Sequence, residues 1–152
     1  GVPQGAAGGR LLMSNLSDIF GTLETILGTA ITGLKAYGYI PDSVNHFPAA
    51  IAMLESFEPE VAFSGNSFEG DIRVVFLMSS ADSSVGFRAL YDYIDPTTGS
   101  LSLIKAIRDN GSLGGAVDSI GVTRIENIGR RDIGGGFYFG FDAILHFIRT
   151  VA

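Results

Sequence analysis

Cysteine is absent from this 152-residue chain, and histidine occurs only twice, as His46 and His146. Without cysteine, the chain can form neither a disulfide framework nor a thiolate metal site. The histidines are far apart in sequence, so no H-x-x-x-H or H-E-x-x-H spacing for a metal ion occurs. We interpret His146 as a structural histidine on the mixed face of the last predicted strand. The sequence therefore predicts no metal site.

The motifs that usually mark catalysis are also missing. No G-x-S-x-G nucleophile turn occurs, and the glycines 134–136 precede a predicted strand instead of opening a helix. The acidic residues are scattered, and Asp92 and Asp95 are typical of a solvated helix end. We therefore expect no enzymatic activity and no cofactor.

Charge and long apolar runs are both scarce. Charged residues make up 17% of the chain against 46% hydrophobic residues, whereas typical domains carry about a quarter charged residues. No apolar run approaches the ~20 residues that span a bilayer, so we expect no membrane association. The net charge of −6 disfavours a dedicated nucleic-acid binder. A sparsely charged surface is more easily explained if part of it is buried against other subunits.

The length suits one domain, which we place at residues 13–152. Ahead of Met13, residues 1–12 form a Gly/Ala-rich extension. This extension has two interpretations: a tail outside the domain, or a flexible arm that docks on a neighbour.

The first predicted element is a helix that begins near Ser17 and ends at Gly38, with Pro41 as a stop. Its apolar stripe has 3-4 spacing and comprises Leu16, Ile19, Leu23, Ile26, Ala30, Leu34 and Tyr37. Gly21 and Gly28 lie on a second edge made of small residues. Each glycine costs a helix about 1 kcal/mol relative to alanine, which indicates close packing there. The partner is either the sheet or another subunit.

Prolines divide the next segment, for which we expect short strands at residues 49–53 and 60–63. Residues 64–70 then form a turn, with Asn66, Phe68 and Glu69 at its tip. Phe68 either docks on an apolar partner surface or folds back on its own sheet. Asp71–Ser79 is the clearest central strand. Because it is apolar on both faces, we expect both to be covered.

Two helices should follow, over about residues 84–94 and from a Ser100 cap to Asn110. Val117–Ile128 and a last strand from Gly136 then form an antiparallel hairpin. A single face of the last strand carries an aromatic and apolar row, namely Phe137, Phe139, Phe141, Ala143, Leu145 and Phe147.

Between these strands we predict a long, mobile, charged tip over residues 129–136, with Arg130, Arg131 and Asp132. The arginines could bind acidic groups of a neighbouring subunit, touch passing DNA, or stay solvated. The order of elements predicts an α+β fold. It is a single domain with a mixed or antiparallel sheet of about five strands, on which an N-terminal helix and a helix pair are packed.

This order resembles a known family through four stretches. They are FPAAIAML (Phe47–Leu54), FEGDIRVVFLM (Phe68–Met78), SLSLIKAIRDNGSLGGAVDSIGVTRIENIG (Ser100–Gly129) and the Gly-aromatic strand GFYFGFDAILHFI. Over about Asp18–Thr150 the chain is similar to the tail-terminator and head–tail joining (neck) proteins of long-tailed bacteriophages.

The resemblance implies a mechanical role in the virion, after assembly in the host cytoplasm. Such proteins form a ring, usually hexameric, that caps the tail tube, stops its polymerisation and offers a surface to the head connector. The family has no catalytic residues, and genomic DNA would pass through without specific binding. The alternative is a small α+β ligand-binding or enzymatic domain in which the aromatic row of the last strand lines a pocket.

Overall fold

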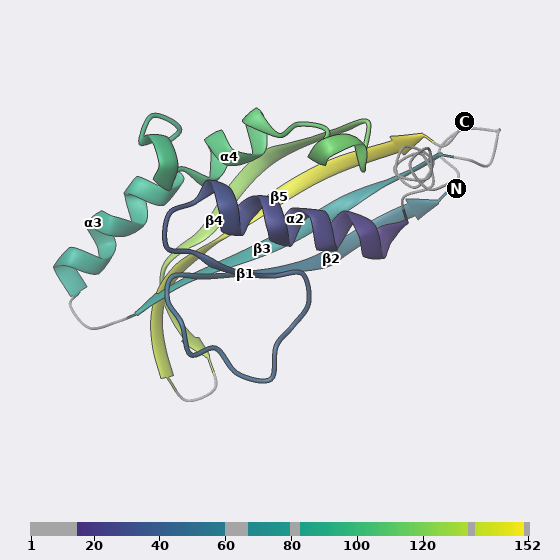
Figure 1. Cartoon of the computed structure of the whole chain (residues 1–152). Helices are drawn as coiled ribbons and strands as arrows, with labels where there is room; N and C mark the ends of the chain where they lie inside the picture. The colour runs from purple at the N-terminus through teal and green to yellow at the C-terminus, as the bar shows by residue number, and fades with distance from the viewer. Residues whose placement is uncertain (1–14, 60–66, 80–82, 134–135, 151–152) are drawn as a thin grey trace.

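The structure is a computed structural model that describes residues 15–59, 67–79, 83–133 and 136–150. It contains a five-stranded sheet with helices packed on it (Figure 1). In chain order the elements are α2 (Leu16–Ala30), β1 (Lys35–Tyr37), β2 (Ala49–Pro59), β3 (Ser67–Ser79), α3 (Ser83–Ile94), the 3-10 turn η1 (Gly99–Leu101), α4 (Leu103–Asp109), the 3-10 turn η2 (Leu113–Gly115), β4 (Ser119–Ile133) and β5 (Gly136–Thr150).

The strand order is β1-β2-β3-β5-β4. β1 is parallel to β2, and the other neighbours are antiparallel. The predicted α+β class, with a mixed sheet, an N-terminal helix and a helix pair, is confirmed.

Helix α2 is shorter than predicted. Asn15, not Ser17, is its N-cap: Asn15 Oδ1 accepts a hydrogen bond of 2.9 Å from the Asp18 backbone N–H. The helix ends at Ala30, because Ile31 is extended and Gly33 has a φ of +78°. The expected helical extension to Tyr37 is therefore wrong, and Lys35–Tyr37 instead pairs with β2 in parallel, with Lys35 opposite Ala49.

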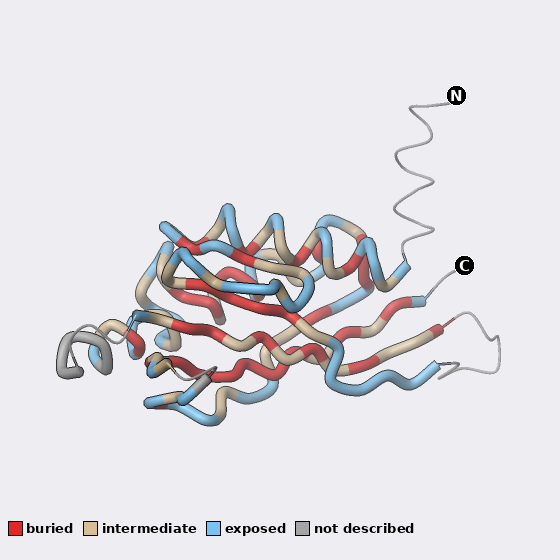
Figure 2. Tube along the Cα trace, turned by 90° about the horizontal axis from the view of Figure 1, so that it is seen from below, coloured by how far each residue is buried: buried red, intermediate tan, exposed pale blue. Residues whose placement is uncertain are grey.

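The core lies between the helices and one face of the sheet. Figure 2 shows the helical layer above the strands. The fully buried side chains of the core include Leu23 of α2, Ile107 of α4, Phe76 of β3, and Phe141 and Phe147 of β5. The rings of Phe76 and Phe141 stack with centroids 4.8 Å apart. Along β5, the predicted apolar row forms this core face from Phe139 onward, whereas Phe137 remains 52% exposed.

The opposite face of the sheet is covered at one end only. There, Phe47, which precedes β2, stacks on Tyr138 of β5 at 5.4 Å, and Leu77 of β3 is buried. Farther along β3 the same face carries Asp71 and Arg73, which are only half-buried. The prediction that the central strand is covered on both faces is thus wrong for its N-terminal half.

Several strand boundaries also differ from the prediction. β2 continues without interruption to Pro59, and the predicted strand at 60–63 lies outside the described residues. The second helix of the pair is capped by Ser102 and not Ser100, since Ser102 Oγ accepts a hydrogen bond of 3.1 Å from the Lys105 N–H. η1 occupies the residues before this cap.

Candidate functional site

The most distinctive chemical feature is a cluster of charged side chains on the sheet face opposite the helices. We call it the charged face; it comprises Glu55, Glu69, Asp71, Arg73, Arg124, Glu126, Asn127, Arg131, Asp142 and His146. It spans β2, β3, β5 and β4, because alternate side chains on each strand point to the same side. The face therefore has a rigid backbone beneath it.

Arg73 lies at the centre of the charged face. Its guanidinium bonds Glu55 from two nitrogens, Nε to Oε1 at 3.1 Å and Nη2 to Oε2 at 2.7 Å. Its Nη1 lies 2.7 Å from Asp142 Oδ2 and 3.0 Å from Glu126 Oε2. Arg73, which lies on β3, is thus bonded to side chains of β2, β4 and β5. The planar, multiply donating guanidinium suits such a role better than a lysine would.

Asp142 is the anionic counterpart of Arg73 and is only 2% exposed. Its Oδ1 accepts a hydrogen bond of 2.7 Å from Arg131 Nη1, and its Oδ2 accepts one of 2.9 Å from Asn127 Nδ2. Asn127 reaches it from an irregularity in the β4–β5 pairing between Glu126 and Gly129, where Asn127 has a φ of +55°. A buried carboxylate is tolerated here because both of its oxygens are paired.

The pKa values on the charged face follow from this pairing. Burial pushes the pKa of Asp142 upward, but the hydrogen bonds from Arg131, Asn127 and Arg73 outweigh it and bring the pKa below its ordinary value. The hydrogen bond from Arg73 lowers the pKa of Glu55, and Glu55 in turn raises the pKa of Arg73. All three groups are therefore charged at neutral pH.

His146 forms a second contact on the same face, toward the far end of β3. Its Nδ1 lies 2.8 Å from Asp71 Oδ1, and its Nε2 lies 2.7 Å from Glu69 Oε2. Two carboxylates at the two ring nitrogens favour the doubly protonated imidazolium. The contact with Asp71, followed by that with Glu69, raises the pKa of His146, and partial desolvation opposes this effect. The structural role predicted for His146 agrees with this geometry.

The charged face has the properties of a structural or docking surface. Arg73 and Asp142 have their hydrogen-bonding groups directed at each other and at neighbouring strands, which leaves neither as a free acid, base or nucleophile. Among the described residues, no group of His, Cys, Asp and Glu is arranged to hold a metal ion. A fixed, alternating pattern of charge can orient a partner by electrostatic complementarity.

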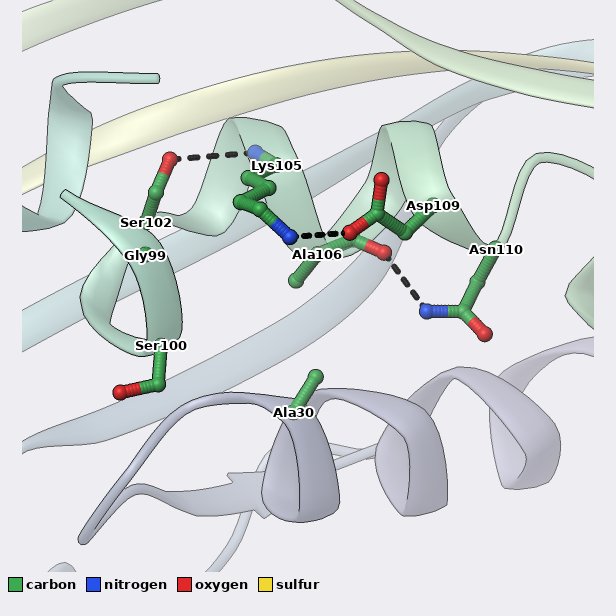
Figure 3. A pocket seen from close by; sticks show the side chains of 8 residues that line it. All are labelled: Ala30, Gly99, Ser100, Ser102, Lys105, Ala106, Asp109 and Asn110. Carbon is green, nitrogen blue, oxygen red and sulfur yellow. Dashed lines mark hydrogen bonds and ion pairs between the residues drawn. The ribbon is translucent and has the colours of Figure 1, made fainter. Parts of the chain in front are cut away.

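A small depression beside α4 is poorly suited to binding a small molecule. Its volume is about 230 Å³, and it lies between α4, η1 and the end of α2 (Figure 3). Its polar groups are engaged with one another: Lys105 Nζ binds Asp109 at 2.5 Å, and Asn110 Nδ2 donates to the Ala106 carbonyl at 2.8 Å. Few polar groups remain to orient a small molecule.

The two α2 glycines predicted as interface residues lie on the exposed side of the helix. A Cβ atom added at Gly21 or Gly28 would meet no other atom within 4 Å. The interpretation that these glycines pack tightly on the sheet is therefore wrong. Gly21 lines a hollow of about 420 Å³ together with Phe20 and the exposed Tyr39.

The predicted turn at 64–70 is shorter than expected. β3 already begins at Ser67, so Phe68 and Glu69 belong to a strand; Asn66 lies outside the described residues. Phe68 packs between Phe57 and Phe147, with ring centroids 5.6 and 6.2 Å away. This agrees with the interpretation that Phe68 folds back on its own sheet.

The predicted mobile tip is also largely strand. β4 extends to Ile133 and β5 starts at Gly136, which places Arg130, Arg131 and Asp132 opposite Phe139, Tyr138 and Phe137. Arg131 binds Asp142 within the subunit. Arg130 is more exposed; its guanidinium carbon lies 3.7 Å from the Phe137 ring centroid, and its Nε lies 3.6 Å from Asp132 Oδ1.

No protein-family model matches this sequence, and no curated protein matches it. In the described part of the chain, none of the helices combines the length and apolarity needed to span a bilayer.

Proposed function

We propose that this chain is a structural virion protein of a long-tailed bacteriophage, a ring-forming tail terminator or head–tail joining subunit. In this role it packs against copies of itself, caps the tail tube and contacts the head connector. The proposal starts from the sequence resemblance over about Asp18–Thr150, and the structure adds three physical arguments.

The exposed glycines of α2 carry the proposal. Gly21 and Gly28 each cost the helix about 1 kcal/mol relative to alanine, and in the described part of the chain no other element comes within 4 Å of a Cβ atom placed at either position. A second subunit whose surface approaches the α2 backbone closely would need the space at these two glycines. In that arrangement the small-residue edge of α2 packs against the next copy in the ring.

The surface beside this edge is suited to burial. The hollow next to Gly21 is bordered by Tyr39, which is 61% exposed, and the following Ile40 is 70% exposed. Aromatic and aliphatic side chains of this kind are enriched at the centres of subunit interfaces. The chain's low content of charged residues, 17%, fits the same use.

The charged face favours a mechanical role. β4 and β5 are each 15 residues long, and Arg73 and Asp142 tie the middle of the sheet together. A stiff sheet with fixed charges transmits force and docks partners without needing a catalytic group. The net charge of −6 would repel DNA phosphates, so that genomic DNA passes without specific binding.

The structure gives little support to the alternative of an aromatic-lined ligand pocket. It depended on the aromatic row of the last strand, and Phe141 and Phe147 of that row are fully buried in the core. Phe139 is 4% exposed.

The experiment compares Gly28→Arg with Gly28→Ala and Ser43→Arg by size-exclusion chromatography with light scattering. Gly28→Arg should reduce the assembly to monomers that remain folded, because the added side chain has open space in the free subunit. Gly28→Ala should raise the unfolding free energy by about 1 kcal/mol through helix propensity. Ser43→Arg adds the same charge at an exposed site outside α2 and should leave the assembly intact. If Gly28→Arg assembles like the wild type, the proposal that α2 lies in the subunit interface is wrong.

A further inference from the structure

An apolar patch remains open at the far end of β2, on the helix-bearing side of the sheet. It consists of Leu54, Phe57 and Phe68, and we call it the distal patch. Leu54 is 40% exposed and Phe57 is 38% exposed, while Phe68 is half-buried. Single exposed apolar residues are common on proteins, but here Leu54 and Phe57 lie close together on one strand and Phe57 contacts the half-buried Phe68.

The distal patch is continuous with the core. Leu54 lies opposite the fully buried Ile72, and Phe57 lies opposite Gly70. A Cβ atom at Gly70 would point at the Phe147 ring, 3.2 Å away, which places Phe57 on the core side of the sheet. The rings of Phe57, Phe68 and Phe147 then follow one another at 5.6 and 6.2 Å. The patch is thus the uncovered margin of the core.

The start of α2 lies at the same end of the molecule as the distal patch. Figures 1 and 2 show the first turn of α2 and the far end of β2 at this end. Leu16, in the first turn of the helix, and Phe68 are both partly buried and pack against the hydrophobic core. The chain that precedes Asn15 therefore starts next to the uncovered margin.

The sequence immediately before Asn15 is apolar. Leu11, Leu12 and Met13 form a run that ends two residues before this N-cap. An extended chain advances about 3.5 Å per residue, so Leu12 can lie up to roughly 10 Å from Asn15. Such a reach allows the run to fold back toward the sheet at this end of the molecule without a long loop, and the entropy cost of closing so short a segment is small.

We propose that Leu11–Met13 of the same chain packs on the distal patch and completes the core at this end. The occupant follows from chain continuity: the run is tethered at the patch, whereas a second copy or another protein must reach it by association. The effective concentration of a tethered segment is in the millimolar range for short linkers. This inference goes beyond the proposed function, and it holds whether or not the subunits form a ring.

Because the chain contains no cysteine, any disulfide in a double-cysteine variant must form between introduced cysteines. A double variant, Leu12→Cys with Phe57→Cys, is oxidised mildly as a mixture of isotopically light and heavy protein. Mass spectrometry of the non-reduced peptides then tells whether the two cysteines of a disulfide came from one chain or two. Leu12→Cys with Ser43→Cys is the matched control, since Ser43 lies in the segment whose Phe47 packs on the opposite face.

We expect the Leu12–Phe57 pair to form a disulfide within one chain in most molecules, several-fold above the control. A disulfide between light and heavy chains would overturn the proposal and assign the patch to a neighbouring copy. A yield no higher than that of the control would overturn it as well.

A second measurement covers the case in which the cysteine variants fold poorly. Leu12→Ser, Phe57→Ser and the double variant form a cycle in which unfolding midpoints are compared. Residues in contact give a double variant that loses less than the two single variants combined. Strictly additive shifts would contradict packing of Leu12 on Phe57.

Discussion

Arg73 on β3 and Asp142 on β5 form the central ion pair of the sheet, with Nη1 and Oδ2 2.7 Å apart. The side chain of Asp142 is 3% exposed and that of Arg73 is 20% exposed. The pair lies on the sheet face opposite the helices, yet the neighbouring side chains of that face shield most of it from solvent. Its contribution to stability should therefore exceed that of an ordinary surface pair.

Replacing Asp142 should be the most costly change on the charged face. Asp142→Ala leaves Arg131 and Asn127 without their shared acceptor, and Arg73 without its most buried partner. We expect a loss of about 2–4 kcal/mol in the unfolding free energy, measured by urea denaturation. Glu55→Ala is the matched control: its side chain is 40% exposed, so the loss in unfolding free energy should be much smaller than for Asp142→Ala. Equal effects of the two variants would contradict the central role of Asp142.

The stability of the protein should depend on pH through His146. The pKa of His146 is raised in the folded state by Asp71 and Glu69, so protonation favours folding. This contribution is fully present below the unfolded-state pKa of about 6.5 and is lost as the pH rises through the higher folded-state value. The difference in unfolding free energy between the wild type and His146→Gln should therefore shrink as the pH rises above about 6.5. A difference that grows with pH would mean that the neutral imidazole is the favoured form.

The expectation that both faces of the central strand are apolar overlooked a polar face that the sequence pattern contains. Period-2 alternation separates Asp71 and Arg73 from Ile72 and Val74, and Asp142 from the aromatic row, so a polar face could have been recognised. The pairing of Arg73 with Asp142 could not, because it depends on the register of β3 against β5. That register is set by the packing of many side chains across distant strands.

Two errors in the prediction have the same physical origin. Leu34 and Tyr37 continue the helical spacing of α2, yet Lys35–Tyr37 is a strand because it gains a parallel partner in β2. The four glycines in residues 129–136 suggested a loop, yet pairing with β5 continues through Arg131. In both places non-local hydrogen bonds override local preference, and a sequence pattern does not contain those partners.

The two arginines predicted to act together should behave differently. Arg131→Glu should lower the unfolding free energy by about 1.5–3 kcal/mol, because it places a carboxylate against the buried Asp142. Arg130→Glu should change stability by at most about 1 kcal/mol, since Arg130 is exposed and its contacts with Phe137 and Asp132 lie at the surface. Of the two arginines, Arg130 is then the one whose side chain is available to a neighbouring subunit.

The assembly assay for these variants is run over a range of salt concentrations. If Arg130 contacts acidic groups of a neighbour, the wild-type assembly loosens as salt rises, and Arg130→Glu fails to assemble even at low salt. If the assembly size changes neither with salt concentration nor in Arg130→Glu, Arg130 is a solvated side chain and not an interface residue.

The central claim, that the subunits form a closed ring, is tested most directly by the mass of the purified wild-type protein in solution. Light scattering should give a discrete species near six times the 16.0-kDa chain mass, and electron micrographs of the same fraction should show rings with an open centre. A single species of 16.0 kDa at every concentration, without annular particles, would contradict the proposed function.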